Sequence, residues 1–283
     1  MRTKSEIEIY TPDREIRIGF FSLFKEIFAD IARSRELIWR LFLRDFSARY
    51  RQSILGVLWA LIMPLIIMGV FVYLHKGGIL RFENIDIPYP VFALFGLTVW
   101  TLFSTGLAAT SESLVKAGAM IVKINFPKIS LVIAAMGEAV VDFLIRLCLL
   151  AAAFIIFKVA PHPQALFLPL VLLPLIILTL GLGLFLSLAS GVVRDIPNII
   201  IVGTTFLMFI CPVAYPLPDI SVFAVLNRWN PLACLIVASR DIVFTGTLSN
   251  PGGFIGSSIF AFFVFFMGLR IFHIAQTKIT ERV

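Results

Sequence analysis

The stretch LIWRLFLRDFSARYRQSILGVLWALIMPL, residues 37–65, changes character halfway along without an intervening linker. Its first half carries four arginines, and from Ile54 onward it carries no charge. A long uncharged, apolar run has the composition of a membrane-crossing helix. The stretch therefore predicts a first half that lies on a membrane surface and a second half that crosses the membrane.

The composition is typical of a multi-pass membrane protein. Hydrophobic residues make up 59% of the 283 residues and charged residues 14%, with a mean hydropathy of +0.98. So much apolar surface exceeds what one water-soluble core buries. The net charge of +7 therefore indicates membrane topology rather than nucleic-acid binding. The three cysteines lie far apart and suggest neither a disulfide framework nor a metal site.

Uncharged stretches predict six membrane-crossing helices. They are residues 54–74, 88–111, 129–157, 164–190, 196–217 and 254–274. Six crossings place both termini on one side, and 18 of the 24 Lys and Arg residues fall on that side or at its helix ends. Both termini are therefore expected in the cytoplasm, in an all-α protein of the inner cell membrane. Small residues from Gly183 to Gly191 predict close approach of another helix.

The domain division that follows has three parts. Residues 1–53 form cytoplasmic N-terminal and amphipathic interface helices, residues 54–274 a six-span transmembrane domain, and residues 275–283 a cytoplasmic tail. Before the last span, Asn230-Pro231 is a good helix start, because Asn caps helices and Pro fits the first turn. That helix would end near Phe244, too short to cross, so it is expected to be re-entrant or interfacial.

The arginine-rich half of the opening stretch has the pattern of an amphipathic helix. Trp39, Leu43 and Phe46 share one face at helical spacing. The cations beside that face are Arg40, Arg44, Arg49 and Arg51. Such a helix lies in the interface, with its aromatics in lipid and its cations at anionic head groups. Two interpretations are open: a topology anchor, or a platform that contacts a partner or collects a lipid-linked anionic substrate.

Five short segments resemble the ABC-2 type permeases that export bacterial polysaccharides such as O-antigen, capsule and teichoic acid. They are RYRQSILGVLWALIMP (49–64), KINFPKISL (123–131), VRDIP (193–197), NPLACLIVASRDIVFTG (230–246) and ITERV (279–283). The resemblance covers about residues 37–283, with the segments in the family's order. Each segment is weak by itself, and the ordered set is specific.

The resemblance implies a half-transporter. Two such chains form a channel as a homodimer, and two separate ATP-binding subunits drive it. The sequence agrees in one respect: none of its 18 glycines is followed by lysine, so it contains no GxxxxGK[ST] phosphate loop. ATP and Mg are therefore expected on the partner subunit and no cofactor on this chain. The implied cargo is a polyisoprenyl-diphosphate-linked polysaccharide.

The loop between the second and third predicted spans is the best candidate for the contact with the ATP-binding subunit. The resemblance places a coupling helix here, with Glu112, Lys116 and Lys123 as polar contacts. Phe126-Pro127 ends it, because the residue before proline is pushed out of helical geometry. The alternative interpretation is a solvated cytoplasmic loop that carries topology-setting charge.

Arg194-Asp195 forms the one charged pair in the short loop after the fourth predicted span. Two roles are open for it, and they are compatible. The pair caps helix ends, where charges complement the helix dipole, or it contacts the ATP-binding subunit.

Three charged residues interrupt the third predicted span. Glu138, Asp142 and Arg146 are spaced i, i+4, i+8 and so form one stripe on a helix. Each unpaired charge near the bilayer centre costs roughly 2.5–3.5 kcal/mol. We therefore expect the stripe to face the protein interior or water, with Asp142 and Arg146 paired. A structural ion pair and a proton relay are the two interpretations.

Aromatic residues are candidates for the path of a sugar polymer, because sugar rings stack on aromatic faces. Trp59, Trp100 and Phe103 are the expected channel-lining residues, with an interfacial belt or packing as the alternative. The four arginines from Arg40 to Arg51 are candidates to attract the lipid diphosphate as it enters.

Two rival functions share some of these features. An ABC-2 exporter of drugs or lipids has the same fold without an open polymer path. A membrane glycosyltransferase needs an acidic nucleotide-sugar and metal site, and the short aqueous loops contain no such cluster. The sequence shows no catalytic constellation and suggests no metal site, so we expect a transporter subunit that is not itself an enzyme.

Overall fold

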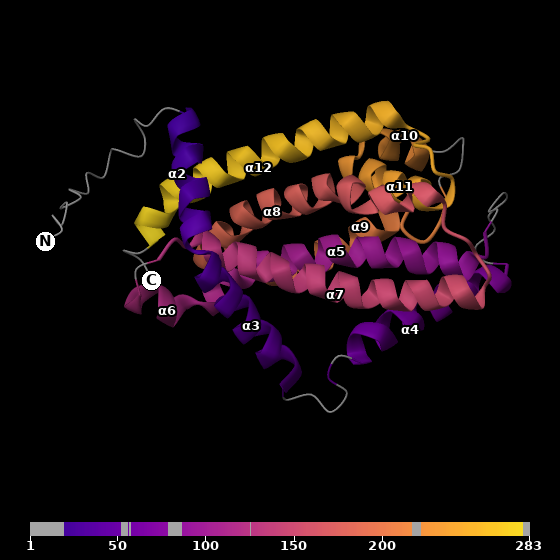
Figure 1. Cartoon of the computed structure of the whole chain (residues 1–283), viewed down its shortest axis with the longest axis horizontal. Coiled ribbons are helices and arrows are strands. Elements are labelled where there is room, and N and C mark those ends of the chain that lie inside the picture. Colours follow the sequence, from indigo (N-terminus) through magenta and orange to yellow (C-terminus); the bar gives the residue numbers. More distant parts are fainter. Residues whose placement is uncertain are drawn as a thin grey trace, which may run out of the picture.

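A computed structural model describes residues 20–51, 56, 58–78, 87–124, 126–216 and 222–279. All regular secondary structure in these residues is helical, as the sequence predicts (Figure 1). The helices are α2 (Phe20–Arg33), α3 (Arg35–Arg51), α4 (Leu58–Lys76), α5 (Tyr89–Lys116), α6 (Gly118–Lys123), α7 (Ile129–Ile156), η1 (Pro163–Phe167), α8 (Leu168–Val192), α9 (Ile196–Ile210), α10 (Val222–Trp229), α11 (Pro231–Phe244) and α12 (Pro251–Ile279).

Five helices of the described residues are long and apolar enough to cross a membrane. They are α4, α5, α7, η1 with α8, and α12. The fifth predicted crossing, residues 196–217, is regular only as α9, which has 15 residues. At 1.5 Å per residue α9 is about 22 Å long, less than the hydrocarbon thickness of about 30 Å. The structure therefore supplies five full-length spans where the sequence predicts six.

Helix α5 is the centre of the bundle. Of its most apolar window, 78% is buried inside the chain, compared with 11% for the peripheral helix α4. Figure 1 shows α5, α7, α8 and α12 running side by side along the long axis. Because α5 is covered by protein on most sides, its side chains form the core, and α4 leaves most of its apolar surface uncovered.

Glycines let α8 approach its neighbours closely, as the small residues from Gly183 to Gly191 predict. A Cβ atom built at Gly183 would lie 2.2 Å from Thr110 Oγ1 on α5. A Cβ at Gly181 would lie 2.7 Å from the backbone of Phe265 on α12. Gly191, at the end of the same series, has nothing within 4 Å. The series therefore packs against α5 at its first member and faces open space at its last.

Helices α2 and α3 lie across the bundle at the end where α5 and α12 finish (Figure 1). Phe24 of α2 packs edge-on against Phe266 of α12, with ring centroids 5.0 Å apart. Phe42 of α3 is buried and fits against Gly137 of α7. Trp39 and Leu43, on the face expected in lipid, are exposed. Phe46 of the same face is half-buried and stacks on Phe42, so α3 docks on the bundle through part of the face expected in lipid.

The approach of α8 to α5 predicts a difference between two glycine substitutions. Gly183→Ala forces a methyl group into Thr110, so we expect it to lower stability by roughly 1–3 kcal/mol through overpacking. Gly191→Ala, with open space around it, is expected to be neutral or to stabilise by roughly 0.5–1 kcal/mol by restricting the unfolded backbone. Thermal unfolding of the two purified variants in detergent measures both. Equal melting temperatures would contradict the packing.

Candidate functional site

The loop between α5 and α7 contains the short helix that the sequence predicts. Helix α6 ends at Lys123, and Ile124 after it is extended, so the helix stops ahead of Phe126-Pro127. Glu112 and Lys116 form an i, i+4 ion pair of 2.7 Å at the end of α5. Lys123 is exposed. Lys116, which is paired with Glu112, and the exposed Lys123 of α6 thus both lie at this end of the bundle.

The turn between α8 and α9 lies at the same end, because α5 and α8 both finish there (Figure 1). Arg194 and Asp195 are both exposed in this turn. Asp195 occupies the N-cap position of α9, yet its side chain makes no capping hydrogen bond. Asp195 therefore stands where a carboxylate complements the dipole of α9, without a hydrogen bond to the helix backbone, and a contact of this pair with the ATP-binding subunit stays a prediction.

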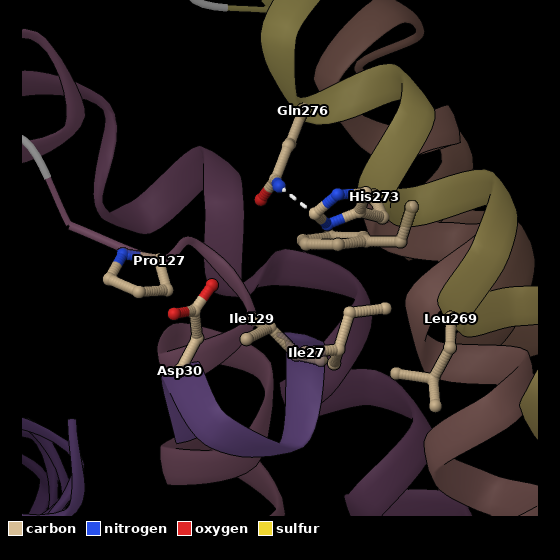
Figure 2. A pocket seen from close by; sticks show the side chains of 8 residues that line it. Ile27, Asp30, Pro127, Ile129, Leu269, His273 and Gln276 are labelled. Atoms are coloured by element: carbon tan, nitrogen blue, oxygen red, sulfur yellow. Dashed lines mark hydrogen bonds between the residues drawn. The ribbon is translucent and has the colours of Figure 1, made fainter. Parts of the chain in front are cut away.

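A small pocket lies between α2, the residues at the start of α7, and α12 (Figure 2). It is lined by Ile27 and Asp30 of α2, Pro127 and Ile129 at the start of α7, and Leu269, Phe272, His273 and Gln276 of α12. Lys128 Nζ donates a 2.6 Å hydrogen bond to the Gln276 carbonyl, and burial lowers the pKa of this ammonium group. Gln276 Nε2 lies 3.0 Å from His273 Nδ1. The pocket has room for about one water molecule, so it serves as a junction rather than a ligand site.

Arg49 links the interface helix to the charged stripe on α7. Its Nη2 lies 2.5 Å from Glu138 Oε2 and its Nη1 lies 2.7 Å from Asp142 Oδ2. The two carboxylates are one helical turn apart, so one planar guanidinium fork reaches both. Glu138, Asp142 and Arg146 are all buried, so the stripe faces the interior as expected. Asp142 accepts a hydrogen bond from Arg49 in this structure. Its expected pairing with Arg146 stays a prediction.

Arg40 and Arg44 of the interface helix also have carboxylates beside them. Arg40 pairs with Glu36 at 2.6 Å on the exposed surface of α3. Arg44 Nε lies 2.7 Å from Asp45 Oδ1, and this hydrogen bond raises the pKa of Arg44. The Arg51 side chain lies outside the described residues. A diphosphate that binds here therefore competes with these carboxylates for the cations.

The three candidate channel-lining aromatics differ in exposure. The side chain of Trp59 on α4 is 43% exposed. Trp100 and Phe103 are 3% and 1% exposed, and their ring centroids lie 5.5 Å apart within the core around α5. The exposure of Trp59 fits both the channel-lining and the interfacial-belt interpretations, and the environment of Trp100 and Phe103 favours the packing interpretation.

Residues 36–244 match the sequence profile of the ABC-2 type transporter family. The chain belongs to this family. It is 24% identical to an O-antigen export system permease protein RfbA of Klebsiella pneumoniae, over 73% of this chain and 79% of that protein. It is 27% identical to an RfbA of Myxococcus xanthus, over 78% and 85%. It is 27% identical to the polysialic acid transport protein KpsM of Escherichia coli, over 82% and 90%.

In this ABC-2 transporter chain the link from Arg49 to Glu138 and Asp142 is the feature that sequence reasoning missed. The stripe on α7 was visible as a spacing, and Arg49 was visible as one of four arginines. Nothing in the local pattern joins them, because 89 residues separate Arg49 from Glu138. The one sequence signal is the excess of buried acid over base in the stripe, which requires a cation from elsewhere in the fold.

The same link predicts the effect of removing Arg49. Arg49→Met leaves two buried carboxylates facing each other, and breaking a buried ion pair costs about 3–5 kcal/mol. Because the Arg49 side chain is 37% exposed, solvent screening reduces the expected loss to about 1–3 kcal/mol. Arg40→Met, which breaks an exposed pair on the same helix, is expected to cost less than about 0.5 kcal/mol.

Thermal unfolding in detergent distinguishes these outcomes. Adding Glu138→Gln to Arg49→Met removes one of the two uncompensated carboxylates and leaves Asp142 for its expected pairing with Arg146, so this variant is expected to recover part of the loss. Equal effects of Arg40→Met and Arg49→Met would contradict the role of Arg49 in docking α3 on α7.

Proposed function

We propose that this chain is the permease subunit of an ATP-driven exporter that moves a lipid-linked polysaccharide across the inner membrane. The observation that carries the proposal is its similarity, over most of both chains, to permease proteins named for O-antigen export and polysialic acid transport. The helical bundle with five apolar spans fits a membrane channel subunit. The cargo is of the polyisoprenyl-diphosphate-linked type, and the direction is from the cytoplasmic to the outer face.

The proposed assembly is a homodimer with two ATP-binding subunits, which hold the ATP and Mg. Both termini lie in the cytoplasm, and α9 with the segment after it completes a sixth crossing. The excess of Lys and Arg on that side supports this orientation. The same orientation places α6, Phe126-Pro127 and the α8–α9 turn on the cytoplasmic face, where an ATP-binding subunit docks.

Entry of the lipid diphosphate is proposed along the exposed side of α3. Arg40 and Arg44 are exposed there and exchange their carboxylate partners for phosphate oxygens, which accept charge-assisted hydrogen bonds of the same kind. Arg49 has the additional structural contact with α7, so its neutralisation affects stability together with export. Separating the two requires the unfolding measurement on the same variant.

Deletion of the gene tests the cargo. We expect lipid-linked polysaccharide to disappear from the cell surface and to accumulate inside, because synthesis continues while export stops. The two pools are measured separately, and complementation with the intact gene is the control. Loss of both pools would favour a glycosyltransferase. Unchanged pools would favour the second candidate, an ABC-2 exporter of drugs or other lipids, which the family match also allows.

A charge reversal tests the coupling surface. Lys123→Glu is expected to reduce co-purification of the ATP-binding subunit at least fivefold, because it reverses an exposed charge on α6. The matched control is Lys76→Glu, an exposed lysine in the last turn of α4, next to the start of α5 at the opposite end of the bundle. Equal retention of the ATP-binding subunit by the two variants would exclude α6 from the interface.

A further inference from the structure

The backbone after α9 is irregular and buried. Helix α9 ends at Ile210, and Cys211, Val213 and Ala214 are each at most 2% exposed. Helical hydrogen bonds stop at this point, so the last carbonyls of α9 and those of the next residues need other donors. Non-helical backbone at membrane depth persists only where protein or water satisfies it. The sequence of this segment alone does not show where those donors come from.

Side chains from several elements donate to these carbonyls. Tyr215 Oη donates to the carbonyls of Phe209 and Ile210, at 2.8 and 2.9 Å. Asn227 Nδ2 donates to the Ile210 carbonyl at 2.8 Å. The further pairs are Tyr89 Oη with the Ala214 carbonyl, and Arg240 Nη2 with the carbonyls of Pro212 and Val213. The end of α9 is thus held by α5, α10 and α11 together.

Arg240 is the charged donor of this set. It comes from α11, is 8% exposed, and its Nη2 lies 2.9 Å from the Pro212 carbonyl and 2.6 Å from that of Val213. Its guanidinium carbon lies 3.9 Å from the centroid of the Phe92 ring. Among the described residues it forms no ion pair. A guanidinium stays protonated, so the carbonyl dipoles, the aromatic face and the negative end of α9 must compensate its charge.

A glycine on α5 makes room for this contact. A Cβ atom built at Gly96 would lie 1.7 Å from the Val213 carbonyl oxygen and 2.8 Å from Arg240 Nη2. Any side chain at this position would therefore push both the segment and the guanidinium away from α5. Gly96 of α5, Val213 after α9 and Arg240 of α11 therefore meet at this point.

We propose that Arg240 is a positioning residue for transport: its guanidinium binds the Pro212 and Val213 carbonyls and holds the buried end of α9 against α5. The end of α9 then stays against α5, and α11 keeps its own place beside α5. Both hydrogen bonds come from Nη2, so lysine supplies the charge and a donor but not the planar guanidinium that lies 3.9 Å from the Phe92 ring centroid. Methionine supplies neither. Measuring export as a test of this inference rests on the proposed function. Measuring the accessibility of the segment after α9 does not.

Cys211 is a native reporter of this contact. It is buried at 0% exposure, next to Pro212, and Asn230 Nδ2 lies 3.3 Å from its Sγ. Because the thiol is fully buried, N-ethylmaleimide cannot reach its sulfur, so labelling of the intact contact is slow. Displacing the segment exposes the thiol and accelerates labelling.

The experiment measures labelling of Cys211 by N-ethylmaleimide in the purified complex with its ATP-binding subunit. Cys148→Ser and Cys234→Ser remove the other two thiols of this chain. In that background we expect Arg240→Met to label at least tenfold faster than the parent, with Arg240→Lys between them. Gly96→Ala is expected to accelerate labelling from the α5 side. Gly256→Ala on α12, where a Cβ meets nothing within 4 Å, is the matched control and should match the parent.

Surface polysaccharide is measured for the same variants in the deletion strain. We expect Arg240→Met to reduce surface polymer at least tenfold while co-purification is retained, with partial rescue by Arg240→Lys. Unchanged labelling in Arg240→Met, or faster labelling with normal export, overturns the inference. If Arg240→Met does not accumulate in the cell, Gly96→Ala is used instead. Unchanged labelling of Cys211 in Gly96→Ala, or faster labelling with normal export, then overturns the inference. If the intact gene restores no surface polymer, the proposed function fails instead, and the ATPase activity of the complex replaces export as the readout.

Discussion

The structure depends on one constraint: in a bilayer, each backbone N–H and C=O must find a partner within the protein. Regular helices satisfy most of this requirement for α4, α5, α7, α8 and α12, although Pro64 in α4 and Pro174 in α8 each remove one backbone donor. Helix α9 stops after 15 residues, so its last carbonyls require donors from elsewhere. The side chains that converge there, with Arg240 among them, follow from that early stop. The least regular part of the fold is therefore also the part with the most specific polar contacts.

A second requirement is that helices approach closely enough to cover the central helix α5. Association in a membrane gains little from hydrophobic transfer, so it relies on close packing and on interhelical polar contacts. Gly183 of α8 meets Thr110, and Gly96 of α5 meets the backbone at Val213. Both contacts bring backbone or a short side chain against a bare helix surface. The burial of Trp100 and Phe103 is a consequence, because α5 is enclosed on most sides.

Local sequence patterns predicted the helices, but they did not predict the contacts between residues far apart in the sequence. Uncharged runs identified five of the spans, and Asn230-Pro231 correctly began a helix that ends at Phe244, with the Asn230 side chain capping Leu232. Residues 211–216 are apolar enough to continue a span, but Pro212 and the turn after Ile210 end the helix α9, so the sixth crossing stays a prediction. The partners of Arg49 and Arg240 were not predictable, because each lies on another element whose placement depends on the whole fold.

Arg49 and Arg240 perform related tasks at different places in the bundle. One joins the interface helix to the acids of α7, and the other joins α11 to the carbonyls beyond α9. Arg49 uses both terminal nitrogens of its planar fork to reach two carboxylates, whereas Arg240 reaches two carbonyls through Nη2 and lies against the Phe92 ring. Each contact is strong because its acceptors are buried, and each must be exchanged for another partner if its helix moves. Rearrangement of α3 or α11 during transport therefore requires a replacement acceptor for a guanidinium, such as water or phosphate. The contacts of these two arginines stabilise the fold, and the same contacts resist movement of the two helices.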